Sequence, residues 1–408
     1  MSTIADDTRG GMRNVWIITA AMTVLAICYT MIIPFLPIYL LELGVPKADV
    51  ALWSGLVFGI TFLIAGIMAP IWGKIADNKG KKRMALRAGF AIAFCYVLIG
   101  LVTDQYQLLM GRALVGFANG FYPAAMTMVS LSVDEKQVGR ALGIFQTGLI
   151  LGNVIGPFLG GAVESVVGMR PVFYVSGVAV FIATLAVLFF VKEPKLHSAG
   201  ADGQSAEHPK STSLREDFKA VQQQPVLVRL LWIFFFMQCV IMMLQPILAL
   251  YVGDMQGTME GAAIVSGTIL SIGGLAGSLT TNLWVRLGER RGYFKTISYC
   301  MMGSGVVLLL QSLPVGIWWF GVLQVLIGSC IVGINPSLSA AVTLNTDPSF
   351  RGRMFGMTTT AQQFGSMVGP VFASIVSTYV GISYVFSITG LLLLYRGFQS
   401  RKLSKKHE

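Results

Sequence analysis

Long apolar stretches separated by short polar segments dominate this chain. About 20 apolar residues in a helix cross the roughly 30 Å hydrocarbon core of a bilayer. One longer polar segment, residues 192–225, separates the sixth such stretch from the seventh. The pattern predicts an all-α membrane protein with twelve transmembrane helices, at Val15–Leu41, Val50–Gly73, Met84–Val102, Leu108–Val133, Val138–Val163, Val172–Val191, Val226–Val252, Ala262–Val285, Thr296–Leu313, Ile317–Leu344, Met354–Thr378 and Gly381–Tyr395.

The two groups of six stretches repeat each other in sequence. At an offset of 212 residues identical residues coincide, and after one inserted residue the offset becomes 213. The coinciding pairs include Pro34 and Pro246, Tyr39 and Tyr251, Gly80 and Gly292, Gly116 and Gly328, Gly152 and Gly365, and Pro157 and Pro370. Two parallel six-helix repeats around a central axis are a known transporter architecture. We therefore expect two pseudo-symmetric six-helix halves, residues 1–191 and 226–408, joined by a cytoplasmic linker at 192–225.

The distribution of charge indicates a membrane topology. Only 12% of the residues are charged, and the net charge is +11. If the N-terminus is cytoplasmic, all but three of the 30 Lys and Arg lie at or near cytoplasmic helix ends; the exceptions are Lys47, Arg112 and Arg170. This bias follows the positive-inside rule. It predicts cytoplasmic termini, a multi-pass protein of the cell membrane, and no nucleic-acid partner.

Few residues suggest catalysis or metal binding. The five cysteines all fall within predicted spans, at no metal-ligand spacing, and read as small apolar residues. The histidines, His197, His208 and His407, lie in the linker and the tail. The chain has no Gly-x-x-x-x-Gly-Lys-Ser/Thr loop to hold a nucleotide. We expect no metal, no cofactor, no enzymatic activity and no ATP-driven pump.

The loop between spans two and three reads Gly73-Lys-Ile-Ala-Asp77-Asn-Lys-Gly80-Lys81-Lys82-Arg83. It resembles the loop signature of the major facilitator superfamily. This resemblance implies that Asp77 forms part of a latch on the cytoplasmic side, with Arg353 as its partner. Glycine permits the tight turn, and a carboxylate accepts charge-assisted hydrogen bonds. The alternative is that the basic residues only set topology. That alternative leaves the Gly-Asp-Gly spacing unexplained.

Span four carries the only basic residue well inside a predicted span. Its segment Arg112-Ala-Leu-Val-Gly116 is similar to the superfamily's R-x-x-x-G motif. A charge within hydrocarbon costs at least about 2.5 kcal/mol, so such residues usually face a partner or a wet cavity. We favour a role for Arg112 in proton coupling. The alternative is a structural arginine bonded to backbone carbonyls.

Span five carries glycine at nearly every fourth position, which lets another helix pack closely. Its residues Gly152, Gly156, Pro157 and Gly160, with Gly161, resemble the signature of the antiporter branch of the superfamily. Packing alone would explain the glycines but not the Gly-Pro pair. Together with Pro34 and Pro37 in span one, the resemblance covers the whole chain and points to the twelve-helix drug:proton antiporters.

Carboxylates are absent from the middle of every predicted span, in contrast to many members of that family. The 19 Asp and Glu lie at span ends, in loops or in tails, so the candidate proton carriers are peripheral: Asp77, Glu42 and Glu164. A central cavity should be lined by polar and aromatic side chains of both halves. Candidates for substrate contact, each of which could instead join two helices, are Tyr122, Gln146, Asn153, Gln238, Met242, Gln245, Asn335, Gln362 and Gln363.

The resemblance implies a secondary active transporter. It would act as a monomer in the lipid bilayer and export amphipathic or cationic drugs in exchange for protons by alternating access. The closest alternative keeps the fold and changes the cargo to a sugar or another metabolite.

Overall fold

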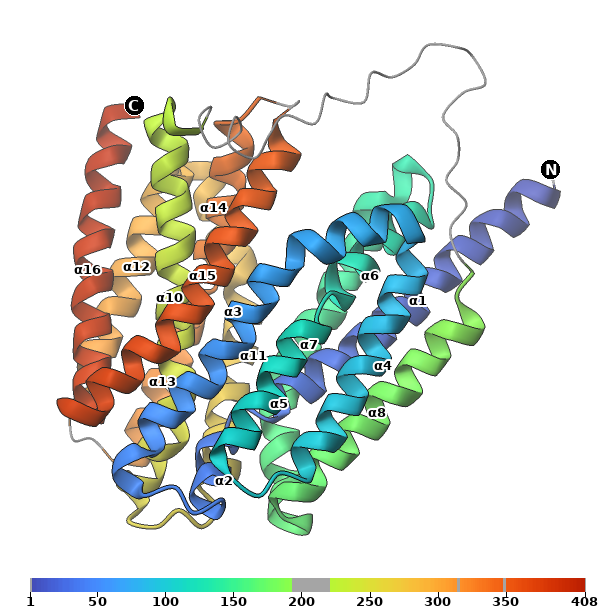
Figure 1. Ribbon diagram of the computed structural model, residues 1–408. Coiled ribbons are helices and arrows are strands. Elements are labelled where there is room, and N and C mark those ends of the chain that lie inside the picture. The colour runs from blue at the N-terminus through green and yellow to red at the C-terminus, as the bar shows by residue number, and fades with distance from the viewer. Residues whose placement is uncertain (1, 193–220, 314–315, 348–349, 408) are drawn as a thin grey trace.

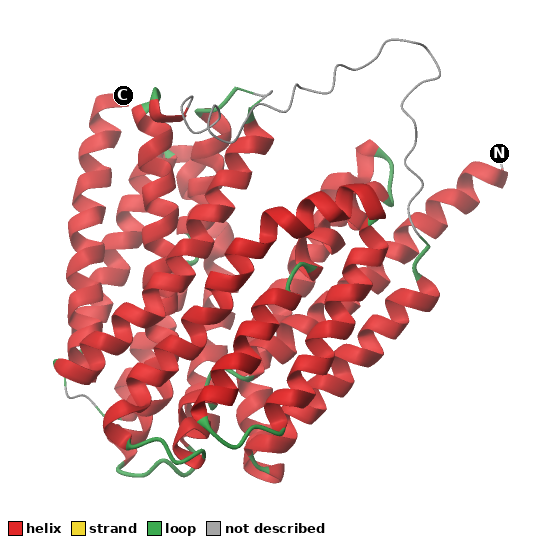
Figure 2. Cartoon of the chain, in the orientation of Figure 1, coloured by secondary structure: helices red, strands yellow, loops and turns green. Residues whose placement is uncertain are grey.

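The computed structural model describes residues 2–192, 221–313, 316–347 and 350–407, and within them the chain is helical with no strand (Figure 2). The helices are α1 (Ser2–Met31), α2 (Leu36–Glu42), α3 (Lys47–Lys79), α4 (Lys81–Gly100), α5 (Gln105–Ala118), α6 (Phe121–Leu131), α7 (Glu135–Val167), α8 (Met169–Phe190), α10 (Pro225–Gln256), α11 (Ala262–Arg291), α12 (Tyr293–Gln311), α13 (Ile317–Ile331), α14 (Ile334–Leu344), α15 (Arg351–Tyr379) and α16 (Ile382–His407).

The helices form two bundles, α1–α8 and α10–α16, which stand side by side (Figure 1). Both chain ends lie at the same end of the molecule, at the top of Figure 1, which we call the terminal side. The short helix α2 and the turn before α5 lie at the other end, which we call the far side. Most of the predicted linker, residues 192–225, falls outside the described residues, and α10 begins at Pro225.

Twelve membrane crossings account for this arrangement. Ten stretches of the described chain are long and apolar enough to span a membrane, with α5–α6 and α13–α14 each counted as one stretch. α15 and α16 are not among the ten, because α15 has a polar terminal half and α16 runs on into the basic tail. Both nevertheless pack along their length inside the second bundle, against α10 and α12 respectively. The predicted twelve-helix fold is confirmed.

The sequence repeat is reproduced in the contacts within each bundle. The Tyr39 hydroxyl donates to the Ile99 carbonyl oxygen at 3.3 Å, and the Tyr251 hydroxyl donates to that of Gln311 at 3.2 Å. These two bonds join positions 212 residues apart. The bundles also share a hydroxyl–thioether contact, from Ser176 to Met31 in the first and from Thr389 to Met243 in the second.

Three predicted spans are broken rather than continuous helices. Residues 32–35 separate α1 from α2, because Pro34 and Pro37 remove backbone donors there. Gly120, with a φ of 128°, separates α5 from α6 in a conformation that favours glycine. α13 and α14 separate at the corresponding place in the second bundle, around Gly333. Hydropathy alone predicts one helix in each case.

The two bundles meet along two helix pairs, α3 with α15 and α7 with α11. Gly55 of α3 faces the Pro370 carbonyl oxygen of α15, and Gly267 of α11 faces that of Pro157 in α7. These contacts are related by the repeat, and both lie in the far-side halves of their helices. A glycine at each point allows backbone to approach backbone, which a β carbon would prevent.

Towards the terminal side the same helices separate. Gly66 still comes near the Gln363 side chain, where a β carbon would lie 3.9 Å from that residue's Cβ. Further along, a β carbon built on Gly73, Gly139, Gly143 or Gly356 would meet no atom within 4 Å. Among the described residues, the bundles are thus closed on the far side, and these positions of the terminal side are open.

Candidate functional site

The loop between α3 and α4 has the turn that its glycines predict. Gly80 ends α3 and precedes α4 with a φ of 95°, a conformation that side-chain-bearing residues rarely adopt. Lys82 reaches across to α8, where its ammonium group donates to the Leu188 carbonyl oxygen at 2.9 Å. Arg83 is exposed and Lys81 is partly buried. The loop therefore contacts its own bundle through a lysine.

The predicted latch between Asp77 and Arg353 stays a prediction. The Asp77 side chain lies outside the part of the chain whose side chains are described. Arg353 is partly buried in the first turn of α15, and its guanidinium lies 4.7 Å from the centre of the Phe350 ring. Both residues are on the open terminal side.

The glycines of α7 pack mainly within the first bundle. Gly152, Gly156 and Gly160 each face α1, where a β carbon would clash with Thr23, Thr30 and Met31 respectively. The Thr30 hydroxyl donates to the Gly152 carbonyl oxygen at 3.3 Å across this contact. Further residues of α7 face the other bundle. Gly161 lies against Ile264 and Ala263, and Pro157 lies against Gly267. The backbone N–H of Phe158 donates to the Ser271 hydroxyl at 3.1 Å. One stretch of α7 thus serves both contacts.

Arg112 is 1% exposed and lies inside the first bundle. Its guanidinium lies 5.6 Å from the centre of the Phe58 ring, and its Nε and Nη1 atoms have no hydrogen-bond partner. Its carbonyl oxygen accepts a bond of 3.1 Å from the Thr61 hydroxyl. Gly116, one turn on, faces the Thr61 carbonyl oxygen, so α5 and α3 pack closely here. The alternative stated above, a structural arginine whose N–H groups are all bonded to backbone carbonyl oxygens, does not hold for Nε and Nη1.

Two tyrosines of the first bundle, Tyr29 of α1 and Tyr96 of α4, are not among the residues that the sequence pattern singles out. Tyr96 is 1% exposed, and the buried Tyr29 hydroxyl has no hydrogen-bond partner. The signal that reveals them is the repeat itself, since the equivalent positions hold Ile241 and Leu308.

The peripheral carboxylates gather at the far side of the first bundle. Glu42, at the end of α2, lies 3.9 Å from Arg170 at the start of α8, and both side chains are nearly half exposed. Glu164, near the end of α7, is partly buried. Two of the three candidate proton carriers therefore lie on the far side, where the bundles are in contact.

The substrate candidates occupy several environments. The Gln146 amide donates to the Tyr122 hydroxyl at 3.1 Å, which joins α7 to α6. Gln238 lies against Gly365 of α15, and the buried Oε1 atom of Gln245 has no partner. The remaining candidates range from buried to exposed: Met242 is buried, Gln362 and Gln363 are partly buried, and Asn153 and Asn335 are exposed. Only Tyr122 and Gln146 are joined directly by a hydrogen bond.

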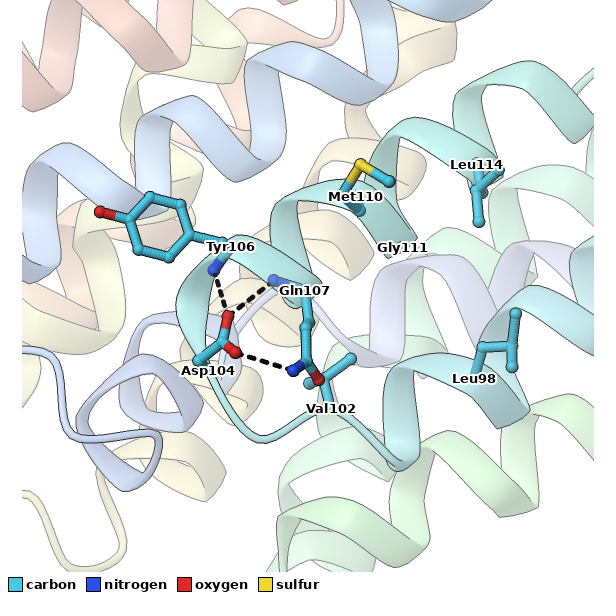
Figure 3. Close-up of a pocket in the computed structure, with 8 residues that line it drawn as sticks. All are labelled: Leu98, Val102, Asp104, Tyr106, Gln107, Met110, Gly111 and Leu114. Carbon is cyan, nitrogen blue, oxygen red and sulfur yellow. Dashed lines mark hydrogen bonds between the residues drawn. The ribbon is translucent and has the colours of Figure 1, made fainter.

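A pocket of about 380 Å³ lies elsewhere, on the far side between α4 and α5 (Figure 3). Asp104 lies at the edge of the pocket. Its carboxylate accepts hydrogen bonds of 2.9 Å from the backbone N–H groups of Tyr106 and Gln107 and thereby caps α5. The rest of the lining is Leu98, Val102, Met110, Gly111 and Leu114, so its wall is mostly apolar. None of the predicted substrate residues lines it.

The break between α5 and α6 is stabilised by residues that sequence reasoning did not single out. Trp72 of α3 donates its indole N–H to the Phe117 carbonyl oxygen at 2.8 Å. Arg87 of α4 lies 3.7 Å above the Trp72 ring and donates to the Ala118 and Asn119 carbonyls. In the second bundle the equivalent tryptophan, Trp284, donates to the Ser329 carbonyl oxygen. Side chains of neighbouring helices thus stabilise the helix break in both bundles.

Comparison with known proteins agrees with this geometry. The family model described as Major Facilitator Superfamily matches residues 18–298 and 264–395. The chain is 31% identical over 384 residues to "Multidrug resistance protein MdtG" of Proteus mirabilis, covering 94% of each chain. It is also 31% identical over 373 residues to the protein of that name from Klebsiella pneumoniae, covering 91% of this chain and 89% of the relative.

Solved structures show the same fold at lower identity. A bacterial homologue of the human lysosomal transporter Spinster, in an inward-facing and unoccupied conformation, superposes with a TM-score of 0.76 at 16% identity, over 97% of both chains. The nucleoside transporter NupG gives a TM-score of 0.76 at 15% identity, over 95% of this chain and 99% of that one.

Proposed function

The chain belongs to the major facilitator superfamily, and we propose that it exports amphipathic or cationic drugs and other toxic compounds across the cell membrane in exchange for protons. The observation that carries this proposal is the near full-length similarity to multidrug resistance proteins. The antiporter-type segment from Gly152 to Gly161, placed where it joins α1 and the other bundle, supports the direction of transport.

The geometry supports alternating access as the mechanism. Residues 1–191 and 226–408 act as two bodies that rock about their far-side contacts, and residues 192–225 connect them in the cytoplasm. With both termini cytoplasmic, the open terminal side corresponds to an inward-facing state. Substrate enters between the bundles from the cytoplasm, and closure of the terminal side exposes it to the exterior. The protein acts as a monomer.

Closure needs a surface on which the terminal halves can meet. The contact stripe of α3 continues from Gly55 and Gly66 to Gly73, and that of α15 continues to Gly356. A β carbon built on Gly73 or Gly356 would meet no atom within 4 Å in the present state. We infer that these two surfaces meet when the terminal side closes, and we assign Asp77 and Arg353 as the candidate latch residues on this side.

Proton coupling is assigned to Arg112 and to the peripheral carboxylates. Arg112 acts on the transition through its buried charge. The proton itself is carried by a peripheral carboxylate, for which the candidates are Asp77, Glu42 and Glu164. Protons can drive the switch only if they bind the two states with different affinity.

Dye transport into liposomes tests the proposal. Purified protein is reconstituted, and uptake of ethidium is followed under an imposed pH gradient, with Arg112→Ala and Asp77→Asn alongside the wild type. We expect transport that needs the gradient, stops on addition of a protonophore, and falls at least tenfold in Arg112→Ala. Asp77→Asn should lower the rate in the same assay.

Two contrary results would contradict different parts of the proposal. Ethidium transport that persists without a proton gradient contradicts proton coupling. A wild type that folds but moves no ethidium or other amphipathic dye contradicts the drug-export proposal and favours a sugar or metabolite exporter of the same fold.

A further inference from the structure

The pocket between α4 and α5 lies apart from the space between the two bundles. α5 packs against α3 and α4, whereas the second bundle meets the first through α3 and α7. Met110 and Leu114 of the pocket are exposed, as is the neighbouring Phe94 of α4. Exposed apolar side chains that gather on one face mark a surface that meets a membrane or a partner. In a chain that spans the bilayer, this pocket therefore opens towards lipid.

The far-side edge of the pocket carries one carboxylate that no basic side chain neutralises. The Oδ1 atom of Asp104 accepts from the backbone N–H groups of Tyr106 and Gln107, and its Oδ2 atom accepts from the Gln107 side-chain amide at 2.8 Å (Figure 3). All of these donors are neutral, and the ion pairs of the described residues do not include Asp104. Gln107 is held in turn, because its Oε1 atom accepts from the Thr103 backbone N–H at 3.1 Å. The carboxylate is thus fixed at the edge of an apolar pocket without a counter-charge.

The pocket runs from the far surface of the bundle into one half of the bilayer. Leu114 lies ten residues beyond Asp104, which is about 15 Å along the axis of a helix. This length is about half of the hydrocarbon core of a membrane. The Tyr106 ring turns away from the pocket and packs against Trp53 of α3, with 5.0 Å between ring centres, so it does not cover the pocket (Figure 3). A molecule in the pocket would have one end at the membrane surface and its body in the adjoining leaflet.

The second bundle has different residues at the equivalent positions. Gly316 replaces Asp104 at the start of α13, where no side chain caps the helix. Leu323 replaces Gly111 of the pocket lining and is 9% exposed, so a buried side chain stands where the first bundle has none. α12 and α13 pack together without the carboxylate and without this glycine. Both features are therefore specific to the first bundle and are not requirements of the fold.

We propose that this pocket binds an amphipathic monocation from the leaflet on the far side, with its cationic group beside Asp104 and its apolar body between α4 and α5. The volume of about 380 Å³ lies in the range of small-molecule sites. Charge complementarity selects this occupant, because a phospholipid would bring its phosphate against the carboxylate and a neutral lipid would leave the carboxylate without a counter-charge. The occupant belongs to the class whose export is proposed above, and its origin in the outer leaflet rests on that proposal. The binding itself rests on the pocket.

Photolabelling of the full-length protein in phosphatidylcholine nanodiscs tests the site. Three probes share a dodecyl chain that carries a diazirine, and they differ in the head group, which is trimethylammonium, hydroxyl or phosphocholine. Mass spectrometry measures the labelling of α4 and α5 relative to that of α12 and α13, which corrects for the different partitioning of the probes into lipid. We expect this ratio to be about fivefold higher for the trimethylammonium probe than for the other two, a preference of the size that one exposed ion pair provides.

Variants identify the groups responsible. Asp104→Asn removes the charge and keeps a side chain that caps a helix about as well as aspartate, so the protein should fold and the preference for the cationic probe should disappear. Gly111→Leu copies the second bundle and should lower the labelling of α5 by all three probes. The matched control is Asp49→Asn, which makes the same change at an exposed carboxylate in the first turn of α3, outside the pocket, and should leave labelling unchanged.

Three outcomes would overturn the inference. Equal ratios for the trimethylammonium and hydroxyl probes would show a groove that accepts any lipid chain. A phosphocholine ratio as high as that of the trimethylammonium probe would make a phospholipid the occupant. An unchanged preference in Asp104→Asn would exclude the carboxylate as the recognising group. Because the labelling needs neither a pH gradient nor transport, failure of this site is distinguishable from failure of the export assay.

Discussion

The effect of substituting a single residue depends on whether its backbone conformation or its neighbours restrict the side chain. The loop signature contains both cases. Gly80 has a φ of 95°, whereas Gly73 lies inside α3 with open space where a β carbon would stand. The two glycines of one motif therefore have different physical roles, which the spacing alone does not reveal.

Substitution of these two glycines by alanine should have opposite effects on stability. Gly80→Ala forces a β carbon into a left-handed conformation, which costs about 1–2 kcal/mol. Gly73→Ala sits in a helix, where alanine is favoured over glycine by about 1 kcal/mol. We expect the thermal unfolding midpoint in detergent to fall for the first variant and to stay level or rise for the second. A loss of stability in Gly73→Ala alone would refute the assignment.

The chemistry of Arg112 could be predicted only in part from the sequence. Its position inside a span marks it as functional. Its environment depends on Phe58 of α3, whose ring centre lies 5.6 Å from the guanidinium, and on burial that leaves Nε and Nη1 without a partner. No local pattern predicts such packing between helices. Comparison of the two repeats does mark the position as unusual, because Gln324 stands at the equivalent place. Departures from an internal repeat are thus as informative as the repeat.

At the scale of helices, the glycine pattern of α7 predicts close packing but not the partner. The structure assigns most of the pattern to α1 and the end of it to α11. The same helix continues towards the terminal side through Gly143 and Gly139, where a β carbon would meet no atom within 4 Å. Position along one helix thus distinguishes glycines that hold the fold from glycines that stay free in this state.

A matched pair of leucine substitutions tests this distinction. In Gly152→Leu the side chain would clash with Ala26 and Thr23 of α1, so we expect a loss of several kcal/mol of stability and poor yield of folded protein. In Gly143→Leu the side chain meets open space, so folding should be normal. The yield of monodisperse protein in detergent is the measurement. Equal yields for the two variants would contradict the assigned contacts.

Helix breaks mark the limit of what hydropathy can predict at this scale. The stretches 15–41, 108–133 and 317–344 are each apolar enough to read as one helix, yet each is interrupted. Hydropathy reports how a side chain partitions into lipid and is insensitive to the backbone. The interruption at Gly120 depends on Trp72 and Arg87 of neighbouring helices, which satisfy the freed carbonyls. Only tertiary structure supplies those partners.

At the scale of the whole molecule, the repeat predicts the architecture better than it predicts the state. Equivalent positions make equivalent contacts both inside the bundles and between them, as at Gly55 and Gly267. What the sequence does not contain is which side is open, since both states use the same residues. The description of the open terminal side therefore comes entirely from the contacts.

The central claim is that the bundles rock about their far-side contacts, and a distance measurement tests it most directly. Spin labels are placed at Gly73→Cys and Gly356→Cys, both exposed on the terminal side, in a background whose native cysteines are replaced by alanine or serine. Distances are recorded by pulsed electron resonance at high and low pH, with and without ethidium. The account predicts two populations, a long one and a short one, whose ratio responds to pH and to the dye. A single long distance that is unchanged under every condition would contradict it.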